Sequence, residues 1–151
     1  MTEEKDISID IEPIGYVDNP EFVAGAASGE KRKDAGWKNI DANIILKDDY
    51  ADGLDDIQQH QRLIIVFWAH NSKSDSKLDR VKIHPQGKQD IPLTGIFSTS
   101  SPSRPNSVLV TVVKFVKHEG NVLTVKGLDA LSGSPVIDIK PYDPEYHIGG
   151  K

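Results

Sequence analysis

Glycine and proline, with 12 and 9 residues respectively, are distributed along the whole chain and cut it into short segments. Such frequent interruption leaves little room for long helices, because both residues disturb regular helical hydrogen bonding. No internal repeat or linker divides the chain. We therefore expect one all-β domain spanning residues 1–151, with flexible ends at 1–6 and 144–151.

Short hydrophobic segments mark the expected strands. Ile7, Ile9 and Ile11 alternate with polar residues, which is the period of a half-buried strand. Residues 63–68 are apolar on both faces and indicate a central, covered strand. Gly120 lies between two strong strands and predicts a tight hairpin. Further strands are expected at 14–17, 39–46, 81–83, 93–98, 108–116, 122–126 and 135–139.

One segment has a helical pattern. Tyr50, Leu54 and Ile57 follow one another at helical spacing. Asp48 and Asp49 precede them, where carboxylates favour the start of a helix. Seven or eight short strands with one minor helix predict a small, closed or nearly closed β-barrel. A doubly wound α/β fold is excluded, because the helices that it needs between strands are missing.

Cysteine is absent, which excludes disulfides, thiol nucleophiles and cysteine-ligated metals. The chain begins MTEEKDISID, an acidic segment without an apolar core, so we expect a cytoplasmic protein without a secretory signal. The longest apolar run covers residues 63–69, far below the roughly 18 residues that a membrane span needs.

The net charge of −5 is unusual for a nucleic-acid binder, but the charge is unevenly distributed. Residues 1–22 carry a net charge of −6 and residues 23–56 carry −3, whereas residues 57–151 carry +4. Five cations between residues 73 and 89 are opposed by two aspartates, so this stretch is a candidate RNA-docking surface. The alternative is that these charges solvate a loop and an exposed strand face.

The segment FSTSSPSRPN, residues 97–106, is the most unusual one in the chain. Its serines and prolines are typical of a rigid polar loop. The same rigidity would hold the guanidinium of Arg104 and the carboxamide of Asn106 in fixed directions. Such groups recognise a carboxylate, a phosphate or the edge of a base.

Residues 127–142, GLDALSGSPVIDIKPY, form a second segment rich in polar chemistry. Asp138 and Lys140 share one face of the expected strand, as in a cleft or in a solvated ion pair. Tyr142 would close the barrel end or stack on a base. Asp129 and the turn at 132–134 can offer a carboxylate, hydroxyls and amides to a ribose.

His70 follows the apolar strand and precedes Asn71, a position that suits a hydrogen-bonded structural residue or a catalyst. The other four histidines show no metal-ligand spacing. No dinucleotide, phosphate-loop or serine-hydrolase signature occurs. The residues alone therefore lead to a β-barrel with an arginine-containing loop and an Asp/Lys/Tyr strand end.

In this order, the motifs resemble the TsaA/TrmO-like (YaeB-like) family of β-barrel S-adenosylmethionine-dependent tRNA methyltransferases. The resemblance extends from Pro13 to Tyr142 and is most specific in SPSRPN, residues 101–106, and DIKPY, residues 138–142. It implies methylation of the exocyclic nitrogen of a threonylcarbamoyl-adenosine next to the tRNA anticodon. It also implies a homodimer that holds the methyl donor in barrel loops near the subunit contact.

The resemblance further implies a set of site residues. Three of them would be catalytic. Asp138 would accept a proton or orient the nucleophile, and Lys140 would keep the Asp138 carboxylate ionised or contact RNA phosphate. Tyr142 would stack on a ring. The residues that would bind the cofactor, S-adenosyl-L-methionine, are His70, Asn71, Ser100, Arg104, Asn106, Val110, Asp129, Ala130, Leu131 and Ser132.

The chain departs from the family pattern at four places. Ser100 stands where the family usually has arginine, Leu109 where it has glycine, and Ser107 where it commonly has proline. Residues 30–34 occupy the region of the family's proline–arginine–glutamine loop. The missing arginine removes a cation that could hold the methionine carboxylate of the cofactor or a phosphate. Arg32 and Arg104 are the candidates that would replace it.

Two alternatives stay open. The first is a methyltransferase acting on another or a small-molecule acceptor, which the acidic net charge and Ser100 favour. The second is a non-catalytic barrel that binds S-adenosylmethionine as a sensor or an interaction module.

Overall fold

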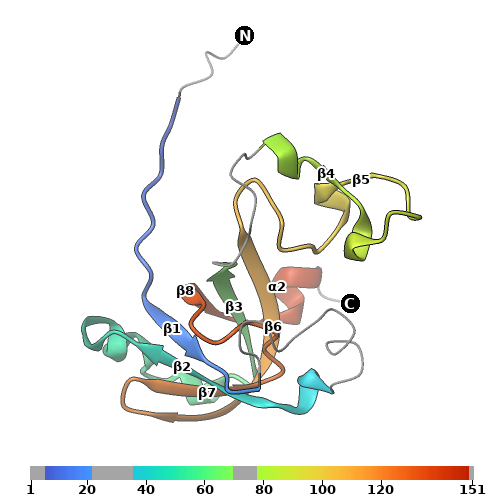
Figure 1. Ribbon diagram of the computed structural model, residues 1–151. Coiled ribbons are helices and arrows are strands. Elements are labelled where there is room, and N and C mark those ends of the chain that lie inside the picture. Colours follow the sequence, from blue (N-terminus) through green and yellow to red (C-terminus); the bar gives the residue numbers. More distant parts are fainter. Residues whose placement is uncertain (1–5, 22–35, 70–77, 150–151) are drawn as a thin grey trace.

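The computed structural model describes residues 6–21, 36–69 and 78–149 (Figure 1). Six strands close into a barrel in the order β1-β2-β7-β6-β3-β8, and every neighbouring pair is antiparallel. The predicted small all-β barrel is therefore confirmed. The bounds are β1 Gly15–Asp18, β2 Asp41–Leu46, β3 Arg62–Trp68, β6 Val108–Glu119, β7 Val122–Lys126 and β8 Pro135–Pro141.

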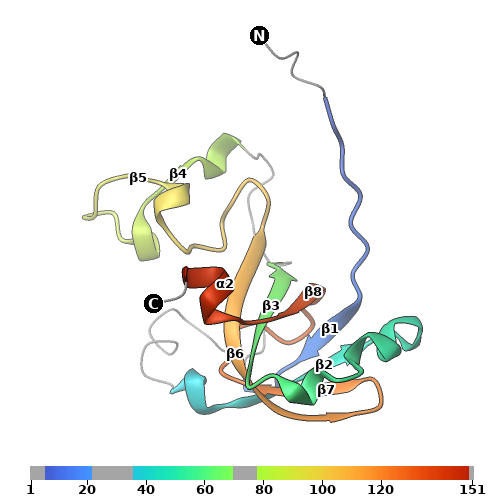
Figure 2. The same cartoon turned by 180° about the vertical axis from the view of Figure 1, so that it is seen from behind.

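Two short strands form a separate two-stranded sheet beyond one end of the barrel, near the start of β6 (Figures 1 and 2). Strands are thus present within both 81–83 and 93–98, as predicted, but they do not join the barrel. We call residues 78–107, which include this sheet, the lobe. Its elements are η4 Leu78–Arg80, β4 Lys82–Ile83, η5 Pro85–Gly87, β5 Thr94–Gly95 and η6 Ile96–Ser98, where η denotes a 3-10 helix.

The helix predicted near Tyr50 is replaced by 3-10 helices. These are η2 Asp48–Leu54 and η3 Ile57–Gln59, and η1 Trp37–Asn39 precedes β2. Asp56, between η2 and η3, has a φ of 66°, a left-handed conformation that interrupts a right-handed helix.

In the described ranges, α2 Pro144–Ile148 is the α-helical element, so the minor helix lies at 144–148 and its predicted position was wrong. The Asp143 side chain caps it by accepting a hydrogen bond from the Glu145 N–H at 3.0 Å. No helix in the described ranges is long and apolar enough to span a membrane.

Inward-facing side chains fill the barrel. Leu63, Ile65 and Phe67 of β3 are at most 2% exposed, and burial of each contributes roughly 1.5–3 kcal/mol. Ile64, on the outer side of β3, is only 8% exposed, so this strand is well covered on both faces, close to the prediction. The rest of the core is Val17, Ala42, Ile44, Leu46, Leu54, Val113, Leu123, Val125, Leu128, Ala130 and Val136.

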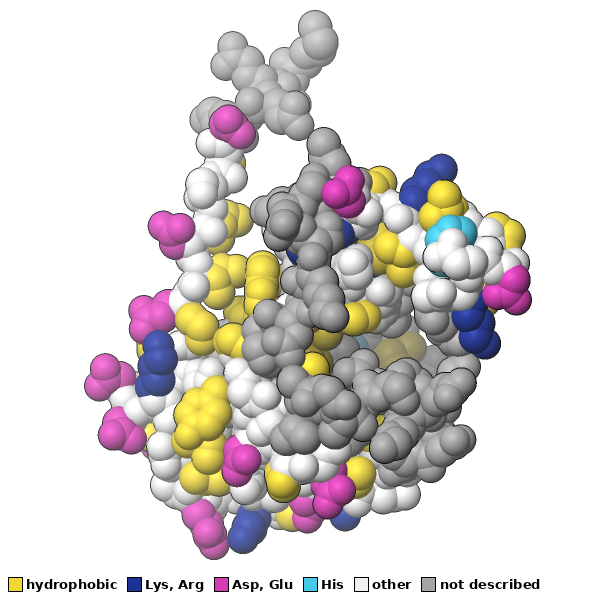
Figure 3. Space-filling view, in the orientation of Figure 1, with side chains coloured by type: hydrophobic (Ala, Val, Ile, Leu, Met, Phe, Trp, Pro, Cys, Tyr) yellow, Lys and Arg dark blue, Asp and Glu magenta, His cyan; other side chains and the backbone are white. Residues whose placement is uncertain are grey.

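Residues 6–14 do not form the predicted strand. Ile7 and Ile9 are 74% and 77% exposed, and the segment runs away from the barrel (Figures 1 and 2). The space-filling view shows acidic and hydrophobic side chains along it (Figure 3). Pro13 cannot donate to a ladder, so regular pairing begins only after it, at Gly15. The apolar residues do alternate along this segment, but a strand forms only where a neighbouring strand supplies hydrogen-bond partners.

Two strands change neighbours along their length, which leaves two edges outside the barrel ladder. β6 pairs with β3 over residues 108–114 and with β7 over residues 114–119, so among the described residues no strand pairs with its first half on the side away from β3, and we call this side its open edge. β8 pairs with β3 along most of its length but with β1 only at Pro135 and Val136. Within the part of the chain that the structure describes, its second half therefore has no neighbouring strand on the β1 side.

The open edge of β8 is protected by its own residues. Tyr142 N donates to Arg62 O at 3.0 Å, so beyond the register shift Asp138 and Lys140 bond to β3, while Ile139 and Pro141 face the open edge. Of these, Pro141 has no N–H. Ile139 donates its N–H to the Asp138 Oδ1 atom at 2.8 Å. Neither position offers a free N–H to another strand.

Candidate active site

Asp138 and Lys140 lie on the outer wall of the barrel. Asp138 is opposite Val66 of β3, and Val66 is opposite Val110 of β6. Lys140 is opposite Ile64 in the same way. Because directly opposite residues of an antiparallel pair point to the same face, Asp138, Lys140 and Val110 share one face. This face is the outer side of the three-stranded segment β6-β3-β8.

Asp138 and Lys140 form an ion pair, with 2.9 Å between Lys140 Nζ and Asp138 Oδ2. The hydrogen bond and the attraction to this carboxylate raise the pKa of Lys140 above its ordinary value of 10.5. The side chains are 59% exposed for Lys140 and 44% for Asp138, so water screens the pair and it adds little stability. Each carboxylate oxygen keeps a further lone pair for a ligand.

Tyr142 comes directly after β8 and is half-buried. Its ring stacks on the His147 imidazole of α2, with 5.4 Å between ring centroids and 24° between planes. The imidazole therefore covers one face of the phenol ring. The predicted stacking on a ligand ring would have to use the other face.

The open edge of β6 exposes backbone groups at Val110. Ala69 N donates to Ser107 O at 2.8 Å and Phe115 N donates to Gln61 O at 3.0 Å, so odd-numbered residues of β6 bond to β3. Val110, with a side chain 61% exposed, thus directs its N–H and C=O toward the open edge. The N–H donor and the C=O acceptor of Val110 lie side by side. They therefore complement an edge of adenine, which carries a ring-nitrogen acceptor next to the N6 amino donor.

The predicted turn at residues 129–132 lies beside this edge. Thr111 Oγ1, one residue from Val110, donates a hydrogen bond of 2.6 Å to Asp129 Oδ1. This bond keeps the chain next to β6 after β7 has ended at Lys126. The structure therefore brings Asp129 and Val110, two of the residues predicted to bind the cofactor, into the same region.

The back of the turn is held by Asn19, which is fully buried. Its Nδ2 atom donates to the carbonyl oxygens of Leu128 and Ala130, each at 3.3 Å. Its backbone N–H donates to Ser132 Oγ at 3.0 Å. Leu131 is tied within the turn, because its carbonyl accepts hydrogen bonds from the residue-134 N–H and hydroxyl. The turn is therefore fixed from both sides before any ligand binds.

Arg104 closes its own loop. Its Nη1 atom donates to the carbonyl oxygens of Thr99 at 2.8 Å and Ser101 at 3.3 Å. Arg80 ties the loop to η4, because its Nη1 atom donates to Arg104 O and to Ser107 Oγ, each at 3.2 Å. The rigid polar loop expected from the sequence is present, and part of the Arg104 guanidinium is used to build it.

The other predicted site residues are placed as follows. Ser100 is exposed in the loop, and Asn106 is exposed at its end, where its carbonyl accepts the Val108 N–H at 2.7 Å. The residues that lie outside the described part of the chain are His70, Asn71 and the 30–34 segment with Arg32.

The basic stretch at 73–89 is only partly available for docking. Arg80 is half-buried and bonded within the lobe, so it is a structural residue. Lys82 and Lys88 are exposed. Lys73 and Lys77 lie outside the described residues.

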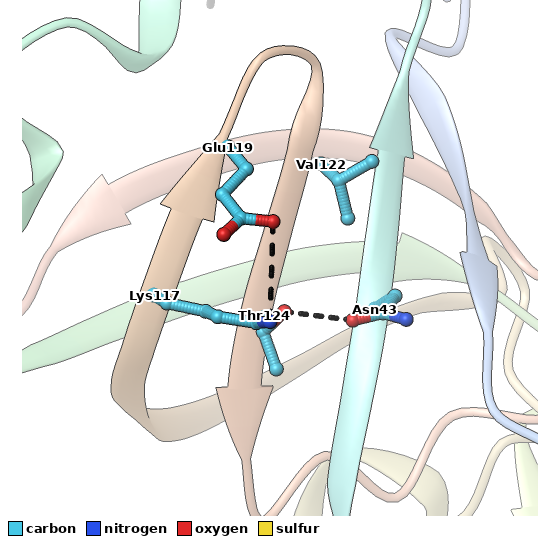
Figure 4. Close-up of a pocket in the computed structure, with 5 residues that line it drawn as sticks. All are labelled: Asn43, Lys117, Glu119, Val122 and Thr124. Carbon is cyan, nitrogen blue, oxygen red and sulfur yellow. Dashed lines mark hydrogen bonds and ion pairs between the residues drawn. The ribbon is translucent and has the colours of Figure 1, made fainter.

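A shallow groove of about 190 Å³ lies on the outer wall across β2, β6 and β7 (Figure 4). Its polar groups pair with one another: Thr124 Oγ1 donates to Asn43 Oδ1 at 2.8 Å, and Lys117 Nζ is 3.9 Å from Glu119 Oε2. Because these groups are already paired, we assign no ligand to the groove.

Sequence reasoning missed the residues that hold the site in place, chiefly Thr111, Asn19 and Arg80. The pair Asn19-Pro20 was a turn signal, but nothing in it indicated complete burial. Thr111 and Arg80 act on residues 18 and 27 positions away in the chain, and only the folded barrel reveals this. In the described ranges, no three His, Asp or Glu side chains gather as a metal site.

Comparison with known proteins identifies the family. The sequence model of the family described as the tRNA-methyltransferase O N-terminal domain matches residues 27–147. A relative from Archaeoglobus fulgidus, named S-adenosyl-L-methionine-binding protein, is 37% identical over 135 residues, 89% of this chain and 90% of that protein. The human tRNA (adenine(37)-N6)-methyltransferase is 32% identical over 139 residues, which cover 89% of this chain and 30% of that protein.

The fold comparison agrees. The crystal structure of TrmO from Pseudomonas aeruginosa matches with a TM-score of 0.72 and 23% identity, over 96% of this chain and 59% of that chain. At this identity the likeness shows the fold alone, and the chain spans little more than half of that protein. The match over residues 27–147 and the identity to the archaeal relative assign the chain to the TrmO family of S-adenosylmethionine-dependent tRNA methyltransferases, as its motifs predicted.

Proposed function

We propose that this chain transfers a methyl group from S-adenosylmethionine to the exocyclic N6 of a threonylcarbamoyl-adenosine next to the tRNA anticodon. The family description and the name of the human relative support tRNA and the N6 atom of adenine 37. The observation that carries the proposal is the shared outer face of Val110 and Asp138. They lie two strands, or about 10 Å, apart.

The residues beside the open edge of β6 fit S-adenosylmethionine. The backbone of Val110 matches an adenine edge. Asp129 uses Oδ1 for Thr111, which leaves Oδ2 for a ribose hydroxyl. Asn19 Oδ1 is buried and has no hydrogen-bond partner among the described residues, so the turn region also holds an acceptor that the fold leaves unsatisfied.

When bound, S-adenosylmethionine supplies an electrophilic methyl group on a sulfonium. Asp138 then accepts the proton of the attacking N–H or orients it. Lys140 holds Asp138 in place through their ion pair of 2.9 Å. Because the pair raises the pKa of Lys140, its ammonium stays charged at neutral pH, and the pair breaks on the alkaline side only when the pH rises through that raised value.

The outer face must be shielded for methyl transfer to exclude water. In the single chain, Val110 and Val112 are 61% and 43% exposed on this face. We propose that in a homodimer a second copy covers the part of the outer face that carries these two valines and leaves the Asp138 side to the substrate. Burial of these valines would supply part of the association energy.

The decisive experiment incubates the purified chain with isotope-labelled S-adenosylmethionine and tRNA that carries or lacks the threonylcarbamoyl group. We expect label only in the tRNA that carries this group. Asp138→Asn should lower kcat roughly 100-fold or more. The affinity for S-adenosylmethionine, measured by calorimetry, should stay within about twofold, because the site described for it lies at β6.

Glu12→Gln is the matched control, since Glu12 is an exposed carboxylate before β1 that pairs with Lys47 at 3.2 Å and does not belong to the outer face of β6-β3-β8. Its kcat should equal that of the unaltered chain. Full activity of Asp138→Asn would remove Asp138 from the reaction.

Ser100 favours a second candidate, a methyltransferase on another acceptor. It is exposed where the family usually carries arginine, so a contact to cofactor or substrate differs. Label in tRNA lacking the threonylcarbamoyl group, or in a small nucleoside, would establish this candidate. Binding of S-adenosylmethionine without transfer to any acceptor would instead favour the non-catalytic barrel.

A further inference from the structure

Strand register assembles a row of cations on the outer wall of the barrel. Arg62 of β3 is directly opposite Lys114 of β6, and Lys114 is directly opposite Lys126 of β7. Opposite residues point to the same face, with Cα atoms about 4.5–5.5 Å apart. The three positive side chains therefore line up across three neighbouring strands, and we call them the cation row.

The cation row is only partly neutralised by its surroundings. Lys126 is paired with Asp41 of β2, with 3.1 Å between Nζ and Oδ1. Arg62 and Lys114 are exposed and form no ion pair within the described residues. Like charges directly opposite one another destabilise a sheet. An anion bound at this wall would relieve the repulsion.

The position of the row connects it to the candidate active site. The backbone hydrogen bonding continues from Arg62 to Tyr142, the residue after β8, whose N–H donates to Arg62 O at 3.0 Å. Lys140 lies two residues from Tyr142 on the same face and is paired with Asp138. A chain of phosphates following the row from Lys126 to Arg62 would thus reach the Asp138 side of the outer face.

We propose that the cation row docks the phosphate backbone of the RNA substrate and leads it to the active site. This inference rests on the proposed action on tRNA. Arginine and lysine in a line are suited to a polyanion, because each contact releases a condensed counterion. The alternative occupant is the acidic segment 6–12 of a second copy, which contains three carboxylates and no cation.

The test compares the unaltered chain with Arg62→Gln/Lys114→Gln in binding a fluorescent tRNA anticodon stem-loop by anisotropy, at a series of salt concentrations. Each phosphate contact contributes about 0.7–0.9 to the slope of log affinity against log salt. The double variant should therefore lose about 1.5 from the slope. Between about 50 and 200 mM salt, its affinity should fall roughly tenfold less than that of the unaltered chain.

Lys47→Gln/Lys117→Gln is the matched control. Both lysines are exposed but already paired, Lys47 with Glu12 and Lys117 with Glu119, and neither belongs to the cation row. This variant removes the same total charge as the double variant. It should nevertheless keep the slope of the unaltered chain, because its two lysines lie outside the cation row. The affinity for S-adenosylmethionine should be equal in all three proteins, which also serves as a check on folding.

Each outcome separates this inference from the proposed function. An unchanged slope in the Arg62/Lys114 variant, while the unaltered chain still binds and methylates tRNA, would overturn the cation row alone. A loss of self-association in that variant with unchanged RNA binding would overturn it in favour of the acidic segment. Absence of any tRNA binding or methylation by the unaltered chain would instead overturn the proposed function.

Discussion

At the scale of single residues, Gly15 shows how closely β1 and β2 approach. A Cβ atom at this position would overlap the Ile45 carbonyl oxygen and lie 2.8 Å from the Leu46 Cα atom. Both obstacles are backbone, which cannot move without disturbing the β1–β2 ladder. The requirement for glycine here comes from the neighbouring strand.

We predict that Gly15→Ala lowers the free energy of unfolding by about 1–3 kcal/mol, because the methyl group forces β1 away from β2. Urea denaturation followed by tryptophan fluorescence measures this change. Gly53→Ala is the control, since no atom lies within 4 Å of the place that its methyl group would take, and it should change stability by less than about 0.5 kcal/mol. Equal stability of both variants would show that β1 can shift without cost.

At the scale of elements, one side-chain hydrogen bond ties β6 to the turn that would bind the cofactor, whose other side is held by Asn19. Thr111 of β6 and Asp129 meet at 2.6 Å, and no other hydrogen bond is found between the β6 strand and that carboxylate in the described structure. Thr111→Val keeps the shape of the side chain but removes this bond, which is worth about 1.5–3 kcal/mol when one partner is charged.

We therefore predict that Thr111→Val weakens S-adenosylmethionine binding by about 10-fold or more in calorimetry, because the turn loses its tie to β6. Thr124→Val is the matched control: it also removes a threonine hydrogen bond, 2.8 Å to Asn43, but on the wall with the groove. It should lower stability and leave the affinity unchanged. If both variants lowered the affinity equally, the effect would come from the barrel as a whole.

Local patterns predicted the barrel because its core strands bury every second side chain, and the sequence shows this as an alternation of apolar and polar residues. The same rule was wrong for Ile7, Ile9 and Ile11, since alternation cannot reveal whether a neighbouring strand exists. It placed the helix wrongly because Asp56 adopts a left-handed conformation that the spacing of Tyr50, Leu54 and Ile57 does not encode. Local signals describe single segments, whereas pairing is a property of the fold.

The candidate site shows the same division. The alternation of side chains along a strand predicted that Asp138 and Lys140 share one face. Of the two alternatives for this face, a cleft or a solvated ion pair, the structure shows the ion pair. The site residues themselves came from the family motifs. The cation row could not be found in the sequence, because its members are separated by 52 and 12 residues and only register aligns them.

At the scale of the whole molecule, the exposed valines on the outer face predict self-association. Val112→Asp should raise the dimer dissociation constant about 100-fold or more, because the new carboxylate would be buried without a partner. Sedimentation equilibrium measures the change. Val116→Asp, on the same strand and 38% exposed, lies beyond the segment that faces β3 and should leave the constant unaltered. A monomeric unaltered chain would exclude the homodimer.

The hydrogen bond from the Ile139 N–H to the Asp138 carboxylate also has a consequence for aggregation. A truncation such as Asp138→Ala would uncover a backbone donor on an unprotected strand edge, which is the kind of edge to which strands of other molecules add. Asparagine keeps an oxygen at the same place. We therefore expect the carboxylate proposed for the reaction also to keep strands of other molecules from adding to β8, and aggregation of the alanine variant would say nothing about its chemistry.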